Sequence, residues 1–369
     1  MTPVERFVRE VLPTVPGGPQ QVTVPTGHSN LIQRAAANRG LSARTFGGTI
    51  YFYDGRLPVG GLRGMTTNLI GSHALAICKS KDLTKQMLRA AGVPTPVGLT
   101  LDSDQFDEAL AHVHASGPLV LKPSEGARGE GVTCGIATEE DLRAAWGRAG
   151  LAAGKEPLFV LEEQIEGIDI RAFVVGRRVA AAATRLPAYV VGDGRRSIAE
   201  LVEQKQQQRE KNVYLAKMPL IVDTALLARG GRALPDVPVA GEVVVLNGAA
   251  NLHAGGENVD VTELVHPDLL SLAVDAARAI PGLGVAGVDL MTPDLGSADG
   301  AVVLETNGPA NIRVHHCPAY GRPQDVAGAI VDEMIATAGA PPRSASRKTS
   351  RRAGVARRMA RAARRRLSA

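Results

Sequence analysis

The residues from Pro118 to Val132 constrain this chain more than any other stretch. A short apolar run ends at Leu121, Lys122 follows, and a loop with glycines at 126, 129 and 131 precedes Val132. Glycines let backbone N–H groups approach phosphate oxygens closely, and a lysine at the root of the loop supplies a positive charge. We therefore interpret this stretch as a strand–loop–strand hairpin that holds a polyphosphate, with a solvated surface hairpin as the alternative.

The composition indicates a folded chain that ends in a basic tail. Of its 369 residues, 44% are hydrophobic and 21% are charged, as in ordinary globular proteins. The 3% aromatic content argues against a surface that stacks nucleic-acid bases. Residues 343–369 hold eleven Lys and Arg and no acid, so the net charge of +5 leaves residues 1–342 at −6.

Targeting and redox signals predict a cytoplasmic protein. The N-terminus has no basic region followed by an apolar one, and no apolar run is long enough to span a bilayer. The three cysteines are scattered and have no metal-binding spacing, which is typical of reduced thiols.

The order of helix-like and strand-like segments predicts an α+β protein in four parts. We expect an N-terminal domain at 1–77, a lid at 78–166, a metal and substrate domain at 167–340, and a tail at 341–369 that is disordered or helical. In the lid, a helix over 82–91 should bury Leu83, Met87 and Leu88. In the third part, a strand-like segment at 220–222 is expected, and the polar segment 206–212 should be exposed.

Three oxygen-bearing side chains end two apolar segments near the C-terminal end of the folded part. Asp289 follows a Gly/Val run, and Glu305 and Asn307 alternate by two, so they project on the same side of their strand. Carboxylate and amide oxygens are the ligands that Mg²⁺ prefers. These residues therefore predict a magnesium site rather than solvated charges at strand ends.

Taken together, these segments resemble the ATP-grasp superfamily of carboxylate–amine ligases, and within it the ATP-grasp domain of cyanophycin synthetases. The resemblance covers roughly residues 79–338. The matching stretches are SKDLTKQMLRAAGVPTPVG (80–98), KPSEGARGEGV (122–132), VLEEQIEGIDIRAFVVG (160–176), RLPAYVVGDGRRSIAELV (185–202), ANLHAGGENVDVTELVHP (250–267), GVAGVDL (284–290) and LETNGPANIRVHHCPAYGRP (304–323). The NLHAGG piece is also similar to glutathione synthetases and ribosomal-protein glutamate ligases.

The resemblance implies a role for particular residues. The implied nucleotide-binding residues are Lys81, Lys122, the flap residues Ser124, Gly126, Gly129 and Gly131, the adenine hinge at Glu162, Glu163 and Ile165, and Asp169 for the ribose. Asp289, Glu305 and Asn307 match the ligands of two Mg²⁺ ions, with Mn²⁺ as an alternative metal. Arg185 and Lys122 match catalytic positions beside the transferred phosphoryl group. Arg185, Asn251, His253, Gly255 and Gly256 match positions that contact the substrate.

The resemblance implies ATP-dependent formation of an amide or peptide bond through an acyl phosphate, with release of ADP and phosphate. The expected substrates are small amino acids or peptides, and we expect a homo-oligomer. Cyanophycin synthetases carry a further ligase domain of the Mur type, and only the tail follows residue 340 here, so we expect a single ligation. The family's Pro-Gly is Pro309-Ala310 in this chain, and residues 203–219 keep little of the family pattern, so acceptor specificity is expected there.

Three questions stay open from the sequence. The tail is a solvated segment, or it docks on an acidic partner, a membrane surface or nucleic acid. A non-catalytic nucleotide-binding protein that acts through this tail is the alternative to the enzyme. It is also open whether His315 or His316 contacts substrate, while Cys317 is interpreted as an ordinary loop thiol.

Overall fold

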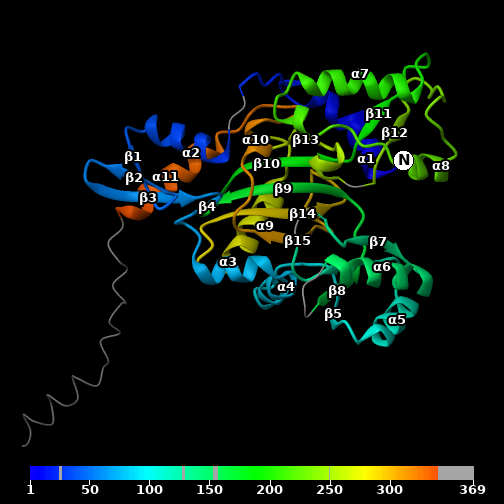
Figure 1. The fold of residues 1–369 in the computed structure, drawn as a ribbon, viewed down its shortest axis with the longest axis horizontal. Coiled ribbons are helices and arrows are strands. Elements are labelled where there is room, and N and C mark those ends of the chain that lie inside the picture. Colours follow the sequence, from blue (N-terminus) through cyan, green and yellow to red (C-terminus); the bar gives the residue numbers. More distant parts are fainter. Residues whose placement is uncertain (25–26, 127–128, 153–156, 249, 340–369) are drawn as a thin grey trace, which may run out of the picture.

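The computed structural model describes residues 1–24, 27–126, 129–152, 157–248 and 250–339. Within these residues the strands form a five-stranded sheet, two four-stranded sheets and a two-stranded ribbon, joined by helices. The five-stranded sheet lies between the two four-stranded sheets (Figure 1). The predicted α+β class is therefore confirmed. No helix in the described part is long and apolar enough to cross a membrane.

The N-terminal part combines short helical turns with a small sheet. Its elements are α1 (Pro3–Arg6), η1 (Phe7–Val11), η2 (Leu12–Thr14), α2 (His28–Ala37), β1 (Ser42–Phe46), β2 (Thr49–Asp54), β3 (Leu57–Arg63) and β4 (Thr66–Thr67). The four strands pair in sequence order, and β2 and β3 turn at Gly55, whose φ of +58° is a left-handed conformation that favours glycine. Two helices, α3 (Ser72–Lys79) and α4 (Lys81–Ala90), lead to the next sheet.

The second four-stranded sheet, here called the lid sheet, has the strand order β5-β8-β6-β7. Its elements are β5 (Gly98–Asp102), α5 (Phe106–Ala115), β6 (Leu119–Pro123), β7 (Thr133–Ile136), α6 (Glu139–Ala152) and β8 (Leu158–Glu163). The lid sheet has its own hydrophobic cluster, in which Leu121, Leu142 and Phe159 are fully buried. The segment between Pro123 and Thr133 thus connects two neighbouring antiparallel strands, as predicted for a strand–loop–strand hairpin.

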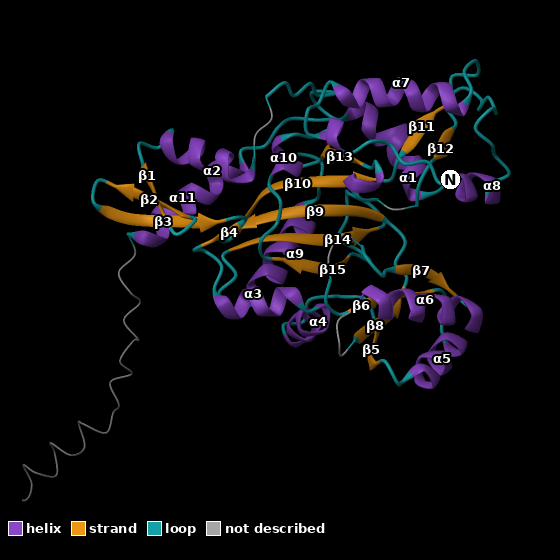
Figure 2. Ribbon diagram, viewed as in Figure 1, coloured by secondary structure: helices purple, strands orange, loops and turns teal. Residues whose placement is uncertain are grey.

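The five-stranded sheet, here called the central sheet, has the order β13-β10-β9-β14-β15 and is entirely antiparallel (Figure 2). Its strands are β9 (Ile168–Val175), β10 (Arg178–Leu186), β13 (Glu257–Asp260), β14 (Val285–Thr292) and β15 (Val302–Asn307). Helices α9 (Pro267–Arg278) and α11 (Val326–Ala338) pack on this sheet. The β9–β10 hairpin turns at Gly176, whose φ is +61°.

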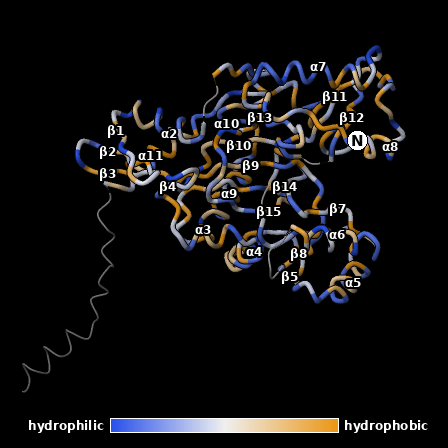
Figure 3. Tube along the Cα trace, viewed as in Figure 1, coloured by the Kyte–Doolittle hydropathy of each residue, from blue (hydrophilic) through white to orange (hydrophobic). Residues whose placement is uncertain are grey.

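A smaller layer covers the far edge of the central sheet. It contains β11 (Tyr189–Val191), α7 (Ile198–Glu210), η3 (Leu215–Lys217), α8 (Thr224–Arg229), β12 (Val243–Val245), η4 (Leu252–Ala254) and α10 (Arg313–His316). Two predictions are wrong here. Residues 220–222 lie outside the strands, and segment 206–212 is not wholly exposed, because Arg209 and Asn212 are 2% and 1% exposed. The prediction for 206–212 was wrong because Arg209 lies on α7, which is hydrophilic along most of its length (Figure 3).

The hydrophobic core of the N-terminal part is continuous with that of the central sheet. Phe7, Ile32 and Phe52 belong to the same buried cluster as Val288 of β14 and Met334 of α11. Burial of apolar surface therefore holds the first 70 residues against the rest of the chain rather than folding them separately.

Candidate active site

One face of the central sheet gathers the predicted metal and phosphoryl residues. Asp289 on β14 lies directly opposite Glu305 on β15 and Arg171 on β9. Residues opposite each other in antiparallel strands share a face, and residues two apart on one strand do as well. Asp169, Arg185 and Asn307 therefore join the same face. The structure brings these six side chains together from four adjacent strands.

Asp289 is held by two arginines. Arg171 donates to it from both Nε and Nη2, the latter at 2.7 Å, and Nη2 of Arg185 lies 3.2 Å from its Oδ2. Burial by itself raises the pKa of this carboxyl, but Arg171 and then Arg185 hold the pKa below its usual range. Asp289 is therefore ionised and fixed in place at neutral pH.

Arg185 is shared between two carboxylates. Its Nε and Nη2 donate to the two oxygens of Asp169, each at 2.6 Å, in a bidentate pair. Burial lowers the pKa of Arg185, but Asp169 and Asp289 outweigh it and raise the pKa above its ordinary value. The guanidinium thus links the residue predicted for the ribose to one of the predicted metal ligands.

Glu305 and Asn307 differ from Asp289 in the hydrogen bonds and ion pairs of their side chains. Among the described residues, neither side chain makes a hydrogen bond or an ion pair, and both are half-buried. No cluster of three or more His, Cys, Asp or Glu suited to a metal occurs in the described part of the chain. Two carboxylates and one amide on one face nevertheless form a hard oxygen donor set that fits Mg²⁺.

The lid sheet contributes a second charged group, here called the lid cluster. Glu162 at the end of β8 is 3% exposed, and its two oxygens pair with Nζ of Lys122 and Nζ of Lys85, each at 2.6 Å. Lys85 also donates to Oγ1 of Thr95 at 3.0 Å and to the carbonyl of Pro96 at 3.2 Å. Burial lowers the pKa of Lys85 to about 8, against the opposing effect of Glu162.

Lys85 was missed in the sequence. The helix over 82–91 was predicted to bury Leu83, but Leu83 is 44% exposed while Lys85 is 3% exposed. A lysine four residues after Lys81 on one helix face was the available signal.

Lys81 lies between the lid cluster and the central sheet. It begins α4, where Ser80 caps the helix, and its Nζ is 3.4 Å from the carbonyl of Gly126. Burial lowers the pKa of Lys81, and its further electrostatic neighbours include Glu305, Lys122 and Glu162. Helix α4 contacts β15 of the central sheet, which places Lys81 near the predicted metal strand.

The Gly-rich loop from Ser124 to Gly131 is here called the flap. It is hydrogen-bonded at its base, and three of its glycines have a backbone conformation with positive φ. Ser124 accepts from the backbone N–H of Lys81 and shares a hydroxyl contact of 3.1 Å with Ser80. Gly126, Gly129 and Gly131 have φ of +130°, +80° and +72°. A Cβ at Gly131 would lie 2.8 Å from that of Ala152, so a residue with a side chain would clash there, and glycine avoids the clash.

The predicted adenine hinge follows β8. Glu163 accepts from the backbone N–H of Val97 at 2.9 Å and returns its own N–H to the carbonyl of the same residue. Ile165 is half-buried in the connection to β9. Both oxygens of the Glu162 carboxylate are already paired with lysines, so this side chain is not free to accept from an adenine amine.

The predicted substrate residues form a tight turn beside the flap. Asn251 caps η4 by accepting from Ala254 at 2.7 Å, and His253 lies within this turn. Gly255 has φ of +86°, and a Cβ on Gly256 would lie 2.6 Å from the carbonyl of Leu186. A Cβ on Gly129 would lie 3.9 Å from Nδ2 of Asn251, so the flap and this turn are neighbours.

The two histidines of α10 have different surroundings. His316 accepts at Nε2 from the backbone N–H of Ala327 at 3.0 Å, so its ring bonds to the first turn of α11. His315 is 2% exposed, packs edge-on against Phe173 and has no hydrogen-bond partner among the described residues. Burial, with Arg171 adding to it, lowers the pKa of His315 to about 3, so it is neutral. Burial also raises the pKa of the Cys317 thiol, consistent with an unreactive loop cysteine.

Arg171 was the other residue that the sequence reasoning missed. Its position two residues after Asp169 places it on the shared face, which was the available signal. The completed site has carboxylate and amide oxygens on the central sheet, with lysines and backbone N–H groups opposite. Such an arrangement can hold phosphate groups together with a divalent cation.

Known proteins resemble this chain in sequence and in fold. No protein-family model matches the chain. The chain is 35% identical over 284 residues to cyanophycin synthetase of Trichormus variabilis, which covers 74% of the chain and 31% of that protein. It is 31% identical over 270 residues to the glutathione biosynthesis bifunctional protein GshAB of Streptococcus mutans, covering 69% of the chain and 35% of that protein.

A solved structure, the bifunctional glutathione synthetase of Pasteurella multocida, shares the fold. The TM-score is 0.62 at 23% identity, over 84% of this chain and 44% of that one. The chain spans about a third of the length of the curated relatives it matches. The predicted resemblance is confirmed: the chain is similar to parts of cyanophycin synthetase and of bifunctional glutathione synthetase, and it shares the ATP-grasp fold.

Proposed function

We propose that this chain is an ATP-dependent carboxylate–amine ligase that acts on an amino acid or a peptide. In the first step a substrate carboxylate attacks the γ-phosphorus of ATP, and ADP leaves as an acyl phosphate forms. In the second step an amine attacks the acyl carbon, phosphate leaves, and the amine loses a proton. The products are an amide, ADP and phosphate.

The position of Lys81 carries this proposal. Its Nζ donates to the carbonyl of Gly126 in the flap at 3.4 Å, and its helix α4 contacts β15, so one cation lies near both the flap and the strand of Glu305. The first step brings a carboxylate toward a polyphosphate, and fixed positive charge is needed to stabilise the transition state. Lys81, Lys122 and Arg185 supply that charge from three separate elements.

Asp289, Glu305 and Asn307 would hold Mg²⁺, as one or two ions, which neutralises charge on the phosphates when bound. The proposed work of the chain's own residues is to fix these oxygens. Arg171 and Arg185 hold Asp289 in one orientation, and Glu305 and Asn307 remain available on the same face. Asp169, paired with Arg185, is proposed to accept from ribose hydroxyls.

An acyl phosphate must be kept from water until the amine arrives. The flap and the turn at Asn251 lie side by side, and the flap glycines leave backbone N–H groups able to reach phosphate oxygens. We propose that the flap closes against this turn, and that Asn251, His253, Gly255 and Gly256 position the acyl group.

The second candidate is a non-catalytic nucleotide-binding protein that acts through residues 341–369, which lie outside the described residues. Such a protein has no need for Lys81, Lys122, Asp289 and Glu305 on facing surfaces. Their juxtaposition favours the enzyme.

The test is to incubate the protein with ATP, Mg²⁺ and pools of amino acids or dipeptides. We expect release of ADP and phosphate that depends on an added amine, with a new amide detected by mass spectrometry. Release of AMP and pyrophosphate, or no turnover with any pool, would contradict the proposal.

Removing residues 343–369 tests whether the tail takes part in catalysis. If the chain is the proposed ligase, turnover of small substrates should be preserved without the tail. Loss of that turnover would mean that the tail takes part in the site.

A further inference from the structure

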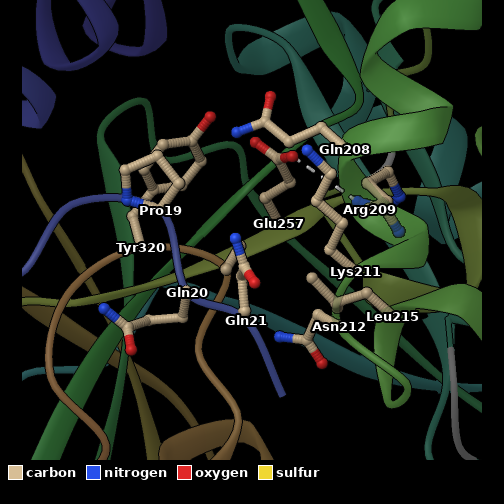
Figure 4. Close-up of a pocket in the computed structure, with 11 residues that line it drawn as sticks. Pro19, Gln20, Gln21, Gln208, Arg209, Lys211, Asn212, Leu215, Glu257 and Tyr320 are labelled. Atoms are coloured by element: carbon tan, nitrogen blue, oxygen red, sulfur yellow. Dashed lines mark ion pairs between the residues drawn. The ribbon is translucent and has the colours of Figure 1, made fainter. Parts of the chain in front are cut away.

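A cavity of about 350 Å³ lies behind the far edge of the central sheet. Figure 4 shows Pro19, Gln20 and Tyr320 on one side of it, and Gln208, Arg209 and Lys211 on the other. This volume is at the lower end of the range for small-molecule sites. Glu257 of β13 lies opposite Leu186, the neighbour of Arg185, so the Glu257 and Arg185 side chains leave opposite faces of the sheet. The cavity is therefore distinct from the candidate active site.

A buried charge group, here called the cavity cluster, borders this space. Oε2 of Glu257 lies 3.0 Å from Nζ of Lys205, and Oε1 lies 3.7 Å from Nη1 of Arg209. The three side chains are 3%, 11% and 1% exposed, and Nζ of Lys205 also sits 3.2 Å from the centre of the Tyr189 ring. Two cations and one carboxylate leave one excess positive charge in a buried place, which is unfavourable unless an anion is near.

Arg209 has bonding capacity that the protein does not use. Its Nη1 donates to the carbonyl of Gly256 at 3.0 Å and its Nη2 to that of Met218 at 2.8 Å. Its Nε is buried and has no hydrogen-bond partner among the described residues. A buried N–H without a partner costs free energy, and a charged donor costs more.

The walls of the cavity are rich in neutral amides. Gln20, Gln21, Gln208 and Asn212 all line it, and Glu257 is its one acidic lining residue in the described part of the chain. Gln20 and Asn212 already bond to backbone groups of the protein. A carboxamide such as that of Gln21 donates and accepts, so it suits a peptide group or an amine. Lys211 is exposed and adds a second positive charge to the lining.

We propose that this cavity is a binding site for a small carboxylate, either a free amino acid or the C-terminal end of a short peptide. A carboxylate carries the single negative charge that balances the cavity cluster. Lys211 and Arg209 contact the carboxylate, and the carboxamides take the rest of the ligand. A polyphosphate is too highly charged for a site with one excess buried positive charge.

The site is linked to the turn that the active-site proposal uses. Arg209 holds the carbonyl of Gly256, which belongs to the turn that begins at Asn251. A ligand that bonds to Arg209 therefore changes the hydrogen bond between Arg209 and Gly256 that holds this turn. Ligand binding should slow hydrogen exchange at segments 19–22 and 208–215.

Binding is tested by isothermal titration of the full chain without ATP or Mg²⁺, so the result does not depend on ligase activity. The four probes are L-alanine, L-alanyl-L-alanine, N-acetyl-L-alanine and L-alaninamide. We expect at least one carboxylate to bind and alaninamide not to bind. Preference for alanine identifies a free amino acid, and preference for alanylalanine or N-acetylalanine identifies a peptide end.

Two variants at exposed lining positions locate the binding. Lys211→Gln should weaken it about tenfold, the loss expected for one hydrogen bond to a charged group. Gln21→Trp should abolish it by filling the cavity. Lys217→Gln, at an exposed lysine of η3 outside the cavity lining, is the matched control and should bind as the wild type does.

Three results would overturn the proposal. They are no heat of binding up to about 10 mM of any probe, equal binding of alaninamide, and unchanged affinity in both Lys211→Gln and Gln21→Trp. Circular dichroism of each variant shows that loss of binding is not loss of the fold.

Discussion

The lid cluster and the cavity cluster contain the same set of charges but differ in the distances between them. Each places two cations around one buried glutamate and leaves one excess positive charge. In the lid cluster both lysines lie 2.6 Å from Glu162, whereas in the cavity cluster the two distances to Glu257 are 3.0 and 3.7 Å. The tight cluster holds its lysines in fixed positions. The loose cluster leaves an arginine N–H unused beside a cavity.

This difference teaches how a buried cation can serve a ligand in two ways. Lys122 is paired with Glu162 and, in the proposed reaction, acts on a phosphate through its charge and position. Arg209 is incompletely paired and offers a hydrogen bond as well. The following predictions, from the largest effect to the smallest, sharpen or break this comparison.

The largest effect is expected on turnover. Lys122→Met should lower kcat on the order of 100-fold to 1,000-fold, as loss of one group that stabilises developing charge does. Lys205→Met, in the cavity cluster, should lower kcat less than about tenfold. Steady-state release of ADP measures both, with Lys79→Met, at an exposed lysine of α3, as control. Equal losses from the two variants would show that the clusters do not differ in role.

The next effect is on stability. Glu162→Gln leaves Lys85 and Lys122 buried without a counter-charge and should lower the free energy of unfolding by about 3 kcal/mol. Glu257→Gln should cost about 1–2 kcal/mol, because its ion pairs are longer. Urea unfolding measures both. The control is Glu139→Gln, which breaks an exposed pair with Arg143 and should cost less than about 0.5 kcal/mol. A larger cost at Glu257 would reverse the ranking.

The third prediction concerns pH. The pKa of Lys85 is about 8 in the folded chain and 10.5 ordinarily. The unfolded state therefore binds more protons between pH 8 and 10.5, and the contribution of Lys85 to stability rises with pH across that window. Relative to Lys85→Met, the free energy of unfolding should increase by up to about 1.4 kcal/mol per pH unit. Parallel pH curves for the two proteins would contradict a lowered pKa at this lysine.

The smallest effect is expected at Thr95, whose hydroxyl accepts from Lys85. Thr95→Val keeps the shape and removes this contact, so it should cost about 1–2 kcal/mol of unfolding free energy. In a Lys85→Met background the same substitution should cost much less, because the partner is gone. An unchanged cost in both backgrounds would mean that Thr95 stabilises the fold independently of Lys85.

The sequence predicted features that follow from local periodicity. Glu305 and Asn307 share a face because strand side chains alternate. Lys122 stood out because apolar residues precede it and glycines follow. Each of these signals lies within a few residues of the chain, so no tertiary information was required.

The buried charges were not predicted, because burial of a cation depends on distant partners. Lys85 lies on a polar helix, and its partners at Glu162, Thr95 and Pro96 come from other segments. Arg209 lies in a run of glutamine and charged residues, yet it is buried against Gly256 and Met218. Hydropathy assigns such residues to the surface, and only the fold shows the carbonyls and carboxylates that solvate them.

The segment before α2 has a consequence for defining a minimal working fragment. Gln20 donates its N–H to Ala319, Val22 donates to Lys211, and Val213 donates back to Val22. The sequence resemblance to ATP-grasp ligases begins at about residue 79, so a fragment that starts at this residue would be a natural choice. Such a fragment would lose the backbone partners of 211, 213 and 319 and one wall of the cavity. The N-terminal boundary of any fragment that keeps this region intact therefore has to precede Pro19.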